Sequence, residues 1–283
     1  MTLDEFKRRQ SELWGSAPWE RLAATMHDVH AELVHVLAPS PGERWLDLAT
    51  GTGAVAIEAA RTGADVTAQD LAPGMIATAR RLGRAAGVTV RFEIGDVESL
   101  PYPDASFDIV SSAFGVTFAR DHIAVARELA RVCRPGGRVG LADWQTRRHR
   151  EFETMLSRFI PEASAEARSH DWGDNDHVVR LLGRDFELKF IEGESPWRGA
   201  SGGAIWQDYV ESNGQARAWV TGLPAARREQ LRRAWIAYFE RCRTADGISA
   251  PREYILVHGR RRGFVTGRPG HRPRFADARP QAG

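Results

Sequence analysis

The sequence lacks the features of a secreted or membrane-spanning protein. Its 283 residues include only two cysteines, Cys133 and Cys242, and a single pair so far apart is typical of reduced thiols rather than of a disulfide framework. No stretch reaches the roughly 20 apolar residues that a membrane-spanning helix needs. The N-terminus is charged from Asp4 onward and has no apolar core of a signal peptide. We therefore expect a cytoplasmic protein.

The chain also has little excess charge. Its formal net charge is +2, and its hydrophobic and charged fractions of 42% and 27% are those of an ordinary globular protein. This balance gives no reason to propose a polyanionic partner, so we expect neither nucleic acid nor a membrane as a partner. The length allows one large domain with an insertion that caps its active site. Both a monomer and a homodimer are compatible with the sequence.

A metal site is not predicted either. The sequence has nine histidines but no cluster with the spacing of metal ligands. Three of them, His27, His30 and His35, fall in HDVHAELVH, which lacks the H-E-x-x-H pattern of zinc enzymes. We expect these three side chains to lie on the polar face of a helix.

From residue 44 onward, short apolar runs typical of buried strands alternate with amphipathic helical patterns. Such alternation predicts a parallel sheet with helices on its faces. We therefore predict an α/β fold with a Rossmann-like, doubly wound, mostly parallel seven-stranded sheet, a helical N-terminal extension and cap insertions. The runs predict strands at 44–49, 65–70, 88–95, 107–114 and 137–144, and helices at 53–62, at 74–86 and after an N-cap at Asp121.

The remaining segments divide the chain around this core. Helical spacing before the first strand predicts two helices, one from Leu3 to Leu13 and one over 19–37. After the core, helical and polar stretches rich in tryptophan surround one more strand at 187–195. The end of the chain is rich in Gly, Pro and Arg and has little to bury. We predict a helical lid at 1–42, a core at 43–145, cap insertions at 146–250, a last strand at 251–262 and a disordered tail at 263–283.

A loop of small residues follows the first predicted strand. In WLDLATGTGAVAIEAA, Asp47 lies near the end of the strand and a helix starts near Gly53. Because Gly51 and Gly53 have no side chain, backbone N–H groups and the helix N-terminus can approach a ligand closely. The pattern from Gly51 to Ala56 also satisfies G-x-G-x-x-G/A, which is typical of dinucleotide enzymes. The loop alone therefore leaves a nicotinamide or flavin cofactor open.

Three carboxylates near strand ends help to distinguish a dinucleotide cofactor from a cofactor that contains an amino acid. Asp47, four residues before Gly51, would crowd a pyrophosphate but could receive the cationic amino group of a bound amino acid. Asp70 ends the second strand, where it could accept hydrogen bonds from a ribose diol. Both kinds of cofactor contain such a ribose, so Asp70 is compatible with either. Asp96 follows the third strand, where a carboxylate could accept from an exocyclic adenine amine. A dinucleotide enzyme has no need of this third acid.

Four stretches carry a resemblance to a known family. LDLATGTG, QDLAPGMIATAR, GDVESLPYPDASFDIVSSAFGV and ELARVCRPGGRVGLADW follow one another at the family's spacing over residues 44–144. In them the chain resembles the class I S-adenosylmethionine-dependent methyltransferases, in particular those similar to ubiquinone and menaquinone biosynthesis C-methyltransferases. The family's usual first loop glycine is Ala49 here, a variation also found in the quinone-methylating group.

The resemblance implies S-adenosylmethionine as the cofactor and indicates which residues hold it. The loop glycines would pack under the cofactor, Asp70 would bind its ribose, and Asp96 and Val97 would meet its adenine. The predicted cofactor residues are Asp47, Ala49, Gly51, Thr52, Gly53, Asp70, Leu71, Met75, Asp96, Val97 and Ser112.

The methyl acceptor would lie beside the cofactor, outside the carboxyl ends of the strands. His170, next to Asp171 in the cap, is the best single candidate for a general base, because an imidazole titrates near neutral pH. Its alternative is a solvent-facing loop histidine. Aromatic residues after the strands and in the lid and cap would wall a planar or apolar acceptor, and core packing is the alternative for them. These predicted wall residues are Trp14, Trp19, Phe114, Phe118, Trp144 and Trp172.

The sequence therefore predicts a methyltransferase that acts on a small organic molecule. The acceptor would be quinone-like or a natural product of secondary metabolism, methylated on oxygen, carbon or nitrogen. One alternative is a protein of the same fold that binds the cofactor without transferring a methyl group. Another is an NAD(P)-dependent oxidoreductase.

Equilibrium binding separates the oxidoreductase from the other two functions. We expect S-adenosylmethionine and its demethylated product to bind, and NADH not to bind, in titration calorimetry. The substitution Asp70→Ala should abolish this binding, because it removes the acceptor for the ribose hydroxyls. An unchanged affinity in Asp70→Ala would contradict the ribose assignment.

Overall fold

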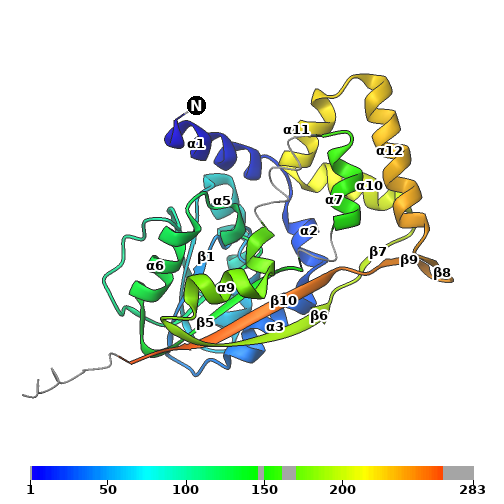
Figure 1. The fold of residues 1–283 in the computed structure, drawn as a ribbon. Helices are drawn as coiled ribbons and strands as arrows, with labels where there is room; N and C mark the ends of the chain where they lie inside the picture. Colours follow the sequence, from blue (N-terminus) through cyan, green and yellow to red (C-terminus); the bar gives the residue numbers. More distant parts are fainter. Residues whose placement is uncertain (1, 146–149, 161–169, 264–283) are drawn as a thin grey trace, which may run out of the picture.

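A seven-stranded sheet forms the centre of the molecule (Figure 1). The structure is a computed structural model that describes residues 2–145, 150–160 and 170–263, without the side chains of residues 150 and 170. The strand order is β3-β2-β1-β4-β5-β10-β6, and only β10 runs antiparallel to its neighbours. This confirms the predicted Rossmann-like, doubly wound sheet. The strands are β1 (Arg44–Leu48), β2 (Asp65–Asp70), β3 (Val90–Ile94), β4 (Phe107–Ala113), β5 (Cys133–Trp144), β6 (Phe186–Glu194) and β10 (Glu253–Arg261).

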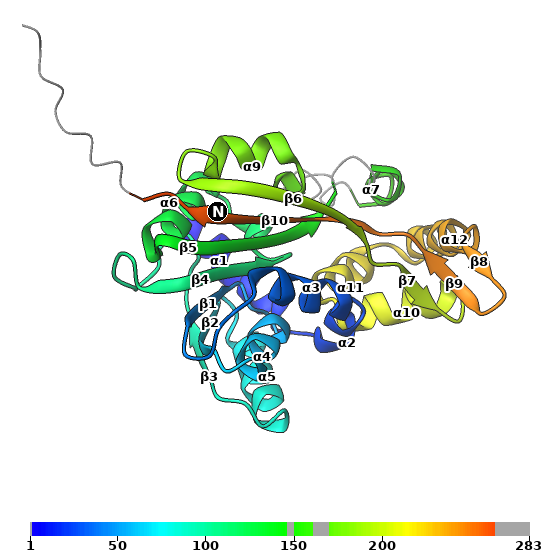
Figure 2. The same cartoon turned by 90° about the horizontal axis from the view of Figure 1, so that it is seen from below.

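Helices cover both faces of this sheet (Figure 2). One face carries α3, α4 and α5, and the other carries α6 and α9. Each helix buries an apolar stripe against the strands and leaves its opposite side in water. The two hydrophobic cores therefore lie on opposite sides of one sheet. These helices are α3 (His27–Leu37), α4 (Ala54–Arg61), α5 (Pro73–Ala85), α6 (His122–Val132) and α9 (Asn175–Leu182).

The apolar run of β1 and the N-cap of α6 occur in the structure where the sequence predicts them. Trp45, Leu46 and Leu48 of β1 are all buried, as in a central parallel strand that is covered on both faces. The helix α6 begins after Asp121, whose carboxylate accepts a hydrogen bond from the backbone N–H of Ala124 at 2.8 Å. The predicted N-cap is thus confirmed.

The single helix predicted over 19–37 is wrong, because the structure divides it in two. The first part, α2 (Glu20–Ala24), ends at Thr25, and α3 begins at His27. The guanidinium of Arg252 donates to the backbone carbonyl of Thr25 at 2.7 Å and to its hydroxyl at 3.3 Å. These contacts stabilise the turn at Thr25 between the two helices. They come from a residue 227 positions away, which local periodicity cannot reveal.

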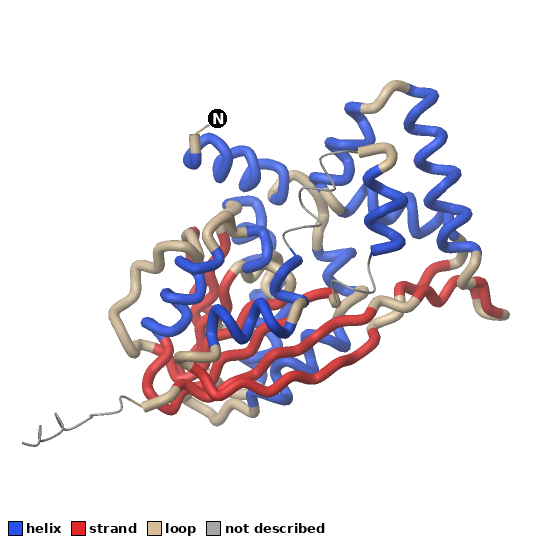
Figure 3. Tube along the Cα trace, in the orientation of Figure 1, coloured by secondary structure: helices blue, strands red, loops and turns tan. Residues whose placement is uncertain are grey.

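A cap of helices and a small sheet stands beside the main sheet (Figure 3). Its core is aromatic, because Trp235 is fully buried and its ring lies 4.9–6.1 Å from those of Trp197, Trp206, Tyr209 and Phe239. Leu22 of α2 joins the same cluster, so the second N-terminal helix belongs to the cap core. The cap elements are α7 (Arg150–Ser157), α10 (Gly202–Ser212), α11 (Gly214–Gly222), α12 (Ala225–Glu240), β7 (Trp197–Gly199), β8 (Arg243–Thr244) and β9 (Gly247–Ala250).

The first helix, α1 (Leu3–Trp14), lies beside α5 at the carboxyl ends of the parallel strands (Figure 1). Thr2 and Glu5 form a capping box at its start. No residue of α1 is fully buried, but Phe6, Leu13 and Trp14 are partly covered by their neighbours. The segment predicted as a lid thus has two parts, since α1 lies over the strand ends whereas α3 packs on the sheet.

Two further expectations concern the C-terminal tail and membrane-spanning helices. The predicted tail at 263–283 lies outside the described residues except for Gly263. None of the helices in the described part of the chain is long and apolar enough to cross a membrane.

Packing on the α6 face gives a direct test of the fold. Leu129 is fully buried, whereas Ile123 of the same helix is 56% exposed. We expect Leu129→Ala to lower the free energy of unfolding by about 2–5 kcal/mol, because it leaves a cavity in the core. The matched change Ile123→Ala should alter it by less than about 0.5 kcal/mol. Equal losses in urea denaturation would contradict this packing.

Candidate active site

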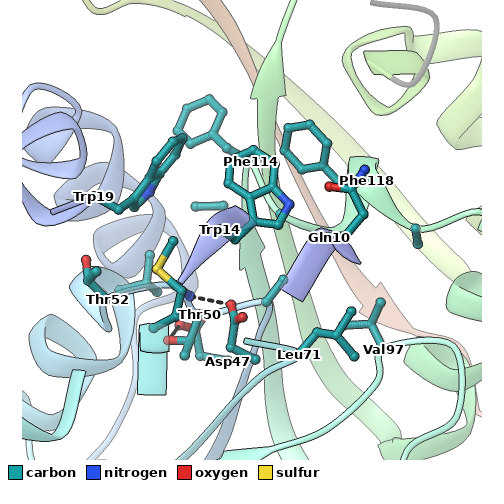
Figure 4. A pocket seen from close by; sticks show the side chains of 18 of the residues that line it. Gln10, Trp14, Trp19, Asp47, Thr50, Thr52, Leu71, Val97, Phe114 and Phe118 are labelled. Carbon is teal, nitrogen blue, oxygen red and sulfur yellow. Dashed lines mark hydrogen bonds between the residues drawn. The ribbon is translucent and has the colours of Figure 1, made fainter. Parts of the chain in front are cut away.

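A cavity opens at the carboxyl ends of β1 and β4, where the strand order reverses. Helix α1 and the loops after β1, β2, β3 and β4 line it. Figure 4 shows Trp14 and Phe114 on one side of this space and Asp47, Leu71 and Val97 on the other. The cavity therefore combines aromatic and acidic walls.

Asp47 is the most deeply buried acid of this cavity. Its side chain belongs to a residue that is only 1% exposed, and it accepts hydrogen bonds from the hydroxyls of Ser111 at 2.6 Å and Thr50 at 2.5 Å. Burial raises the pKa of Asp47 from 3.8 to about 6, against the opposing effect of these hydrogen bonds. No cation is paired with Asp47 among the described residues. A cationic group that enters the cavity would therefore find an unneutralised carboxylate.

The loop after Asp47 requires left-handed backbone. Ala49, Gly51 and Gly53 have φ values of 47°, 55° and 86°. A residue other than glycine loses about 1–2 kcal/mol in this conformation, so alanine at position 49 carries a cost that glycine would not. The side chain of Ala49 fits because Gly115 lies against it, where an added Cβ would stand 2.8 Å from the Ala49 carbonyl oxygen.

Asp70, at the end of β2, binds the backbone of the same loop. Its two carboxylate oxygens accept from the backbone N–H groups of Gly51 at 2.8 Å and Ala72 at 2.9 Å. Burial raises its pKa, although both N–H groups act in the opposite direction. Each carboxylate oxygen has a second lone pair, so Asp70 can still accept hydrogen bonds from a ligand in the cavity.

Asp96 has a partner that the sequence did not predict. Lys7 of α1 reaches across the cavity and places its ammonium 2.5 Å from both Asp96 and Glu98. Glu98 also accepts from the backbone N–H groups of Arg120 and Asp121. These ion pairs help to hold α1 over the cavity, together with the packing of the Trp14 ring on those of Trp19 and Phe118.

A second cavity continues from the first into the cap. The two share five residues, which are Trp14, Trp19, Met26, Phe114 and Phe118. Beyond this shared wall the second cavity is strongly aromatic and is bounded by Trp144, Trp197 and Trp219, with Arg252 between two of them. The guanidinium carbon of Arg252 lies 5.0 Å from the ring centroids of both Trp144 and Trp197.

Phe114 stands at the junction of the two cavities in an unusual backbone conformation. Its φ of 59° is rare for a bulky residue, and such strain is concentrated at functional sites. The ring stacks on Trp144 with 4.3 Å between centroids and an interplanar angle of 26°. The strained turn therefore directs this ring into the wall of the cavities.

His30 is a site residue that the sequence interpretation missed. It is 5% exposed, lines the first cavity, and lies 6.2 Å from the ring of Phe114 between centroids. Its Nδ1 atom is buried without a hydrogen-bonding partner among the described residues. Burial lowers the pKa of His30 from 6.5 to about 4, so the imidazole is neutral at physiological pH.

The expectation that His30 lies on a polar helix face is wrong for a reason visible in the sequence. The apolar stripe of α3 runs through Met26, Leu33 and Leu37, and position 30 falls on the same face, four residues after Met26. His27 and His35, in contrast, are exposed, as expected. A histidine on an apolar stripe was the available signal.

Most of the predicted cofactor residues meet around the first cavity. Gly53 begins α4 directly behind the loop, with an added Cβ only 3.1 Å from the ring of Phe92. Ser112 is buried but is not part of the cavity lining, because its neighbour Ser111 is the residue that turns toward Asp47. The predicted residues that line the cavity are Asp47, Ala49, Gly51, Thr52, Asp70, Leu71, Met75, Asp96 and Val97.

Not all of the residues predicted to contact the methyl acceptor line the cavities. Trp14, Trp19, Phe114 and Phe118 line both cavities, and Trp144 lines the second. Trp172 lines neither of them and is instead 2% exposed, because it packs into the core on the α6 face of the sheet. His170 begins the short turn η2 (His170–Gly173), and its side chain lies outside the described part of the structure.

The sequence of the core matches a known family. Residues 46–141 fit the model of a family described as a methyltransferase domain. The match spans the segment from β1 into β5. The match agrees with the predicted enzyme class for this segment.

Similar proteins extend this comparison beyond the domain itself. An uncharacterized protein of Mycobacterium tuberculosis is 39% identical over 155 residues, which are 53% of this chain and 56% of that protein. A demethylmenaquinone methyltransferase of Mycobacterium sp. (strain KMS) is 37% identical over 132 residues, 47% of this chain and 55% of that one. The YcgJ protein of Bacillus subtilis has the same fold, with a TM-score of 0.58 and 22% identity over 84% of this chain and 99% of its own. The chain spans about half the length of the curated relatives it matches.

The buried carboxyl of Asp47 makes stability depend on pH. Its pKa in the folded protein, about 6, lies above the ordinary value of 3.8, so stability that is present at low pH is lost as the pH rises toward 6. The difference corresponds to about 3 kcal/mol. We therefore expect Asp47→Asn to gain stability relative to the parent protein between pH 4 and pH 7, by up to this amount. Urea unfolding of both proteins at several pH values, without cofactor, measures it, and parallel curves would contradict the raised pKa.

Proposed function

We propose that this protein transfers a methyl group from S-adenosylmethionine to a small, flat and largely apolar acceptor. The observation that carries this proposal is the junction of an acidic cavity with an aromatic one through a shared wall that includes Trp19, Phe114 and Phe118. Two molecules of different chemistry can meet at such a junction without bulk water between them.

The acidic cavity fits the donor. Asp47 is suited to bind the ammonium group of the methionine part, Asp70 to accept from the ribose hydroxyls, and Val97 with Asp96 to border the adenine. The buried Oε1 atom of Gln10, which has no partner among the described residues, lines the same cavity and can accept a further hydrogen bond. When bound, the cofactor supplies a methyl group that its sulfonium has already made electrophilic. The protein's task is to hold the acceptor in line with that methyl group.

The aromatic cavity fits the acceptor. Walls of indole and phenyl rings favour a planar, apolar molecule, which agrees with a quinone-like or natural-product acceptor. One similar protein is named a demethylmenaquinone methyltransferase, and this name supports a quinone-like molecule. Oxygen, carbon and nitrogen remain the three candidate positions of methylation.

We expect His30 to hydrogen-bond the polar atom of the methyl acceptor. It is the neutral histidine of the first cavity, close to Phe114 at the junction, and its Nδ1 atom is otherwise unpartnered. A buried polar atom without a partner lowers the stability of the protein by about 1–3 kcal/mol. A methyl acceptor that forms a hydrogen bond with this atom recovers that energy. His30 can therefore orient the acceptor by a hydrogen bond without bringing a charge into the aromatic space.

Methyl transfer itself is tested with labelled cofactor. Incubation with methyl-labelled S-adenosylmethionine and small-molecule extracts of the source organism, with quinones as a defined set, should give a labelled small molecule. Asp70→Ala should give none. Cofactor binding in calorimetry without a labelled product in any extract would contradict methyl transfer and favour a protein that only binds the cofactor.

The role of His30 is tested on the acceptor identified in this way. We expect His30→Ala to lower kcat/KM by about 10–100-fold, because it removes one hydrogen bond to the acceptor, and to leave cofactor affinity within about twofold. His27→Ala, an exposed change in the same helix, should leave kcat/KM unchanged. A loss of cofactor affinity that matches the loss of kcat/KM would place His30 in the donor site instead.

A further inference from the structure

A cluster of possible metal ligands lies outside both cavities. It consists of His122 at the start of α6, Asp171 in η2 and His177 in α9. One ligand atom of each residue lies within 4.8 Å of those of the other two. The three residues come from three elements, and the fold brings them together behind the turn η1 (Val116–Phe118).

The hydrogen bonding of His122 fixes which of its nitrogens is free. Its Nε2 atom lies 3.2 Å from the backbone carbonyl of Thr117, and a carbonyl can only accept a hydrogen bond. Nε2 therefore carries the proton, and the lone pair of Nδ1 points toward His177. Metal-binding histidines generally donate their other N–H group to a carbonyl or carboxylate in this manner.

The distance between the two imidazoles is that of a metal site. His122 Nδ1 and His177 Nε2 are 3.3 Å apart. Two nitrogens that bind one tetrahedral zinc ion at about 2.0–2.1 Å stand roughly 3.3–3.4 Å from each other. Asp171 is exposed, so its carboxylate can rotate to approach the same point. The separation of the two nitrogens is therefore already that of a shared zinc ion.

We propose that His122, Asp171 and His177 bind one zinc ion. Two imidazoles and one carboxylate are a ligand set that zinc accepts, whereas magnesium and calcium prefer oxygen ligands alone. This site could not be predicted from residue spacing, because His122 and His177 are separated by 55 positions. The proposal is independent of the acceptor and of methyl transfer.

The zinc ion would fasten part of the cap segment to the core. Asp171 adjoins Trp172, which is buried and whose ring lies 5.6 Å from that of His122 between centroids. Thr117, which accepts from His122, adjoins Phe118, a wall residue of both cavities. The ion would thus join η2 and α9 to the turn that carries this wall.

Zinc binding is measured on the full-length chain without an affinity tag, after treatment with a chelator. We expect one Zn²⁺ per chain in titration calorimetry and metal analysis. At free Zn²⁺ about 100-fold above Kd, the melting temperature should rise by about 4–8 °C. Magnesium and calcium at the same concentration should give no rise.

Matched variants locate the ion. His177→Gln and His122→Gln should each lower zinc affinity at least tenfold, and Asp171→Asn, which removes the charge at nearly constant size, should weaken it as well. His35→Gln, an exposed change elsewhere, should bind zinc like the parent protein. Absence of stoichiometric binding, or binding that survives both histidine changes, would overturn the proposal and leave a hydrogen bond between the two histidines.

Discussion

The pairing of β1 with β4 positions most of the site. Asp47 stands opposite Ser111 in this register, so the Ser111 hydroxyl reaches the carboxylate at 2.6 Å while it accepts from the indole of Trp45 at 2.7 Å. A slip of one residue would turn Asp47 to the other face of the sheet. The sheet also extends in opposite directions from this pair, toward β2 on one side and β5 on the other, which opens the crevice above it.

Most carboxylates line the first of the joined cavities, whereas most aromatic rings, with Arg252 among them, line the second. The acids lie at the ends of β1, β2 and β3, and the rings lie in the N-terminal helices, the turn after β4 and the cap. His30, which stands near the junction, is neutral because burial lowers its pKa. Electrostatic attraction is strongest where water is excluded, so this division favours a cationic donor at one end and an apolar acceptor at the other.

The order of strands and helices in the core could be predicted from the sequence because each element carries its own periodicity and caps, as at Asp121. The loop glycines and the three acids could be predicted because they fall at strand ends. What local patterns could not reveal depends on contacts between distant residues. Arg252 binds the carbonyl of Thr25 between α2 and α3, Lys7 pairs with Asp96, and Trp172 enters the core rather than a cavity wall. The burial of His30 is different, since its place on the apolar stripe of α3 was visible.

The contact between Ala49 and Gly115 bears on how this loop can change in evolution. Ala49 keeps a side chain at a left-handed position only because residue 115 has none, and a Cβ at 115 would stand 2.8 Å from the Ala49 carbonyl oxygen. Glycine at position 49 would not relieve that carbonyl contact, since the carbonyl belongs to the backbone. Position 115 is therefore restricted to glycine whichever small residue stands at 49, whereas position 49 can pass between glycine and alanine. Among relatives, position 49 should accordingly vary between glycine and alanine, whereas position 115 should always be glycine.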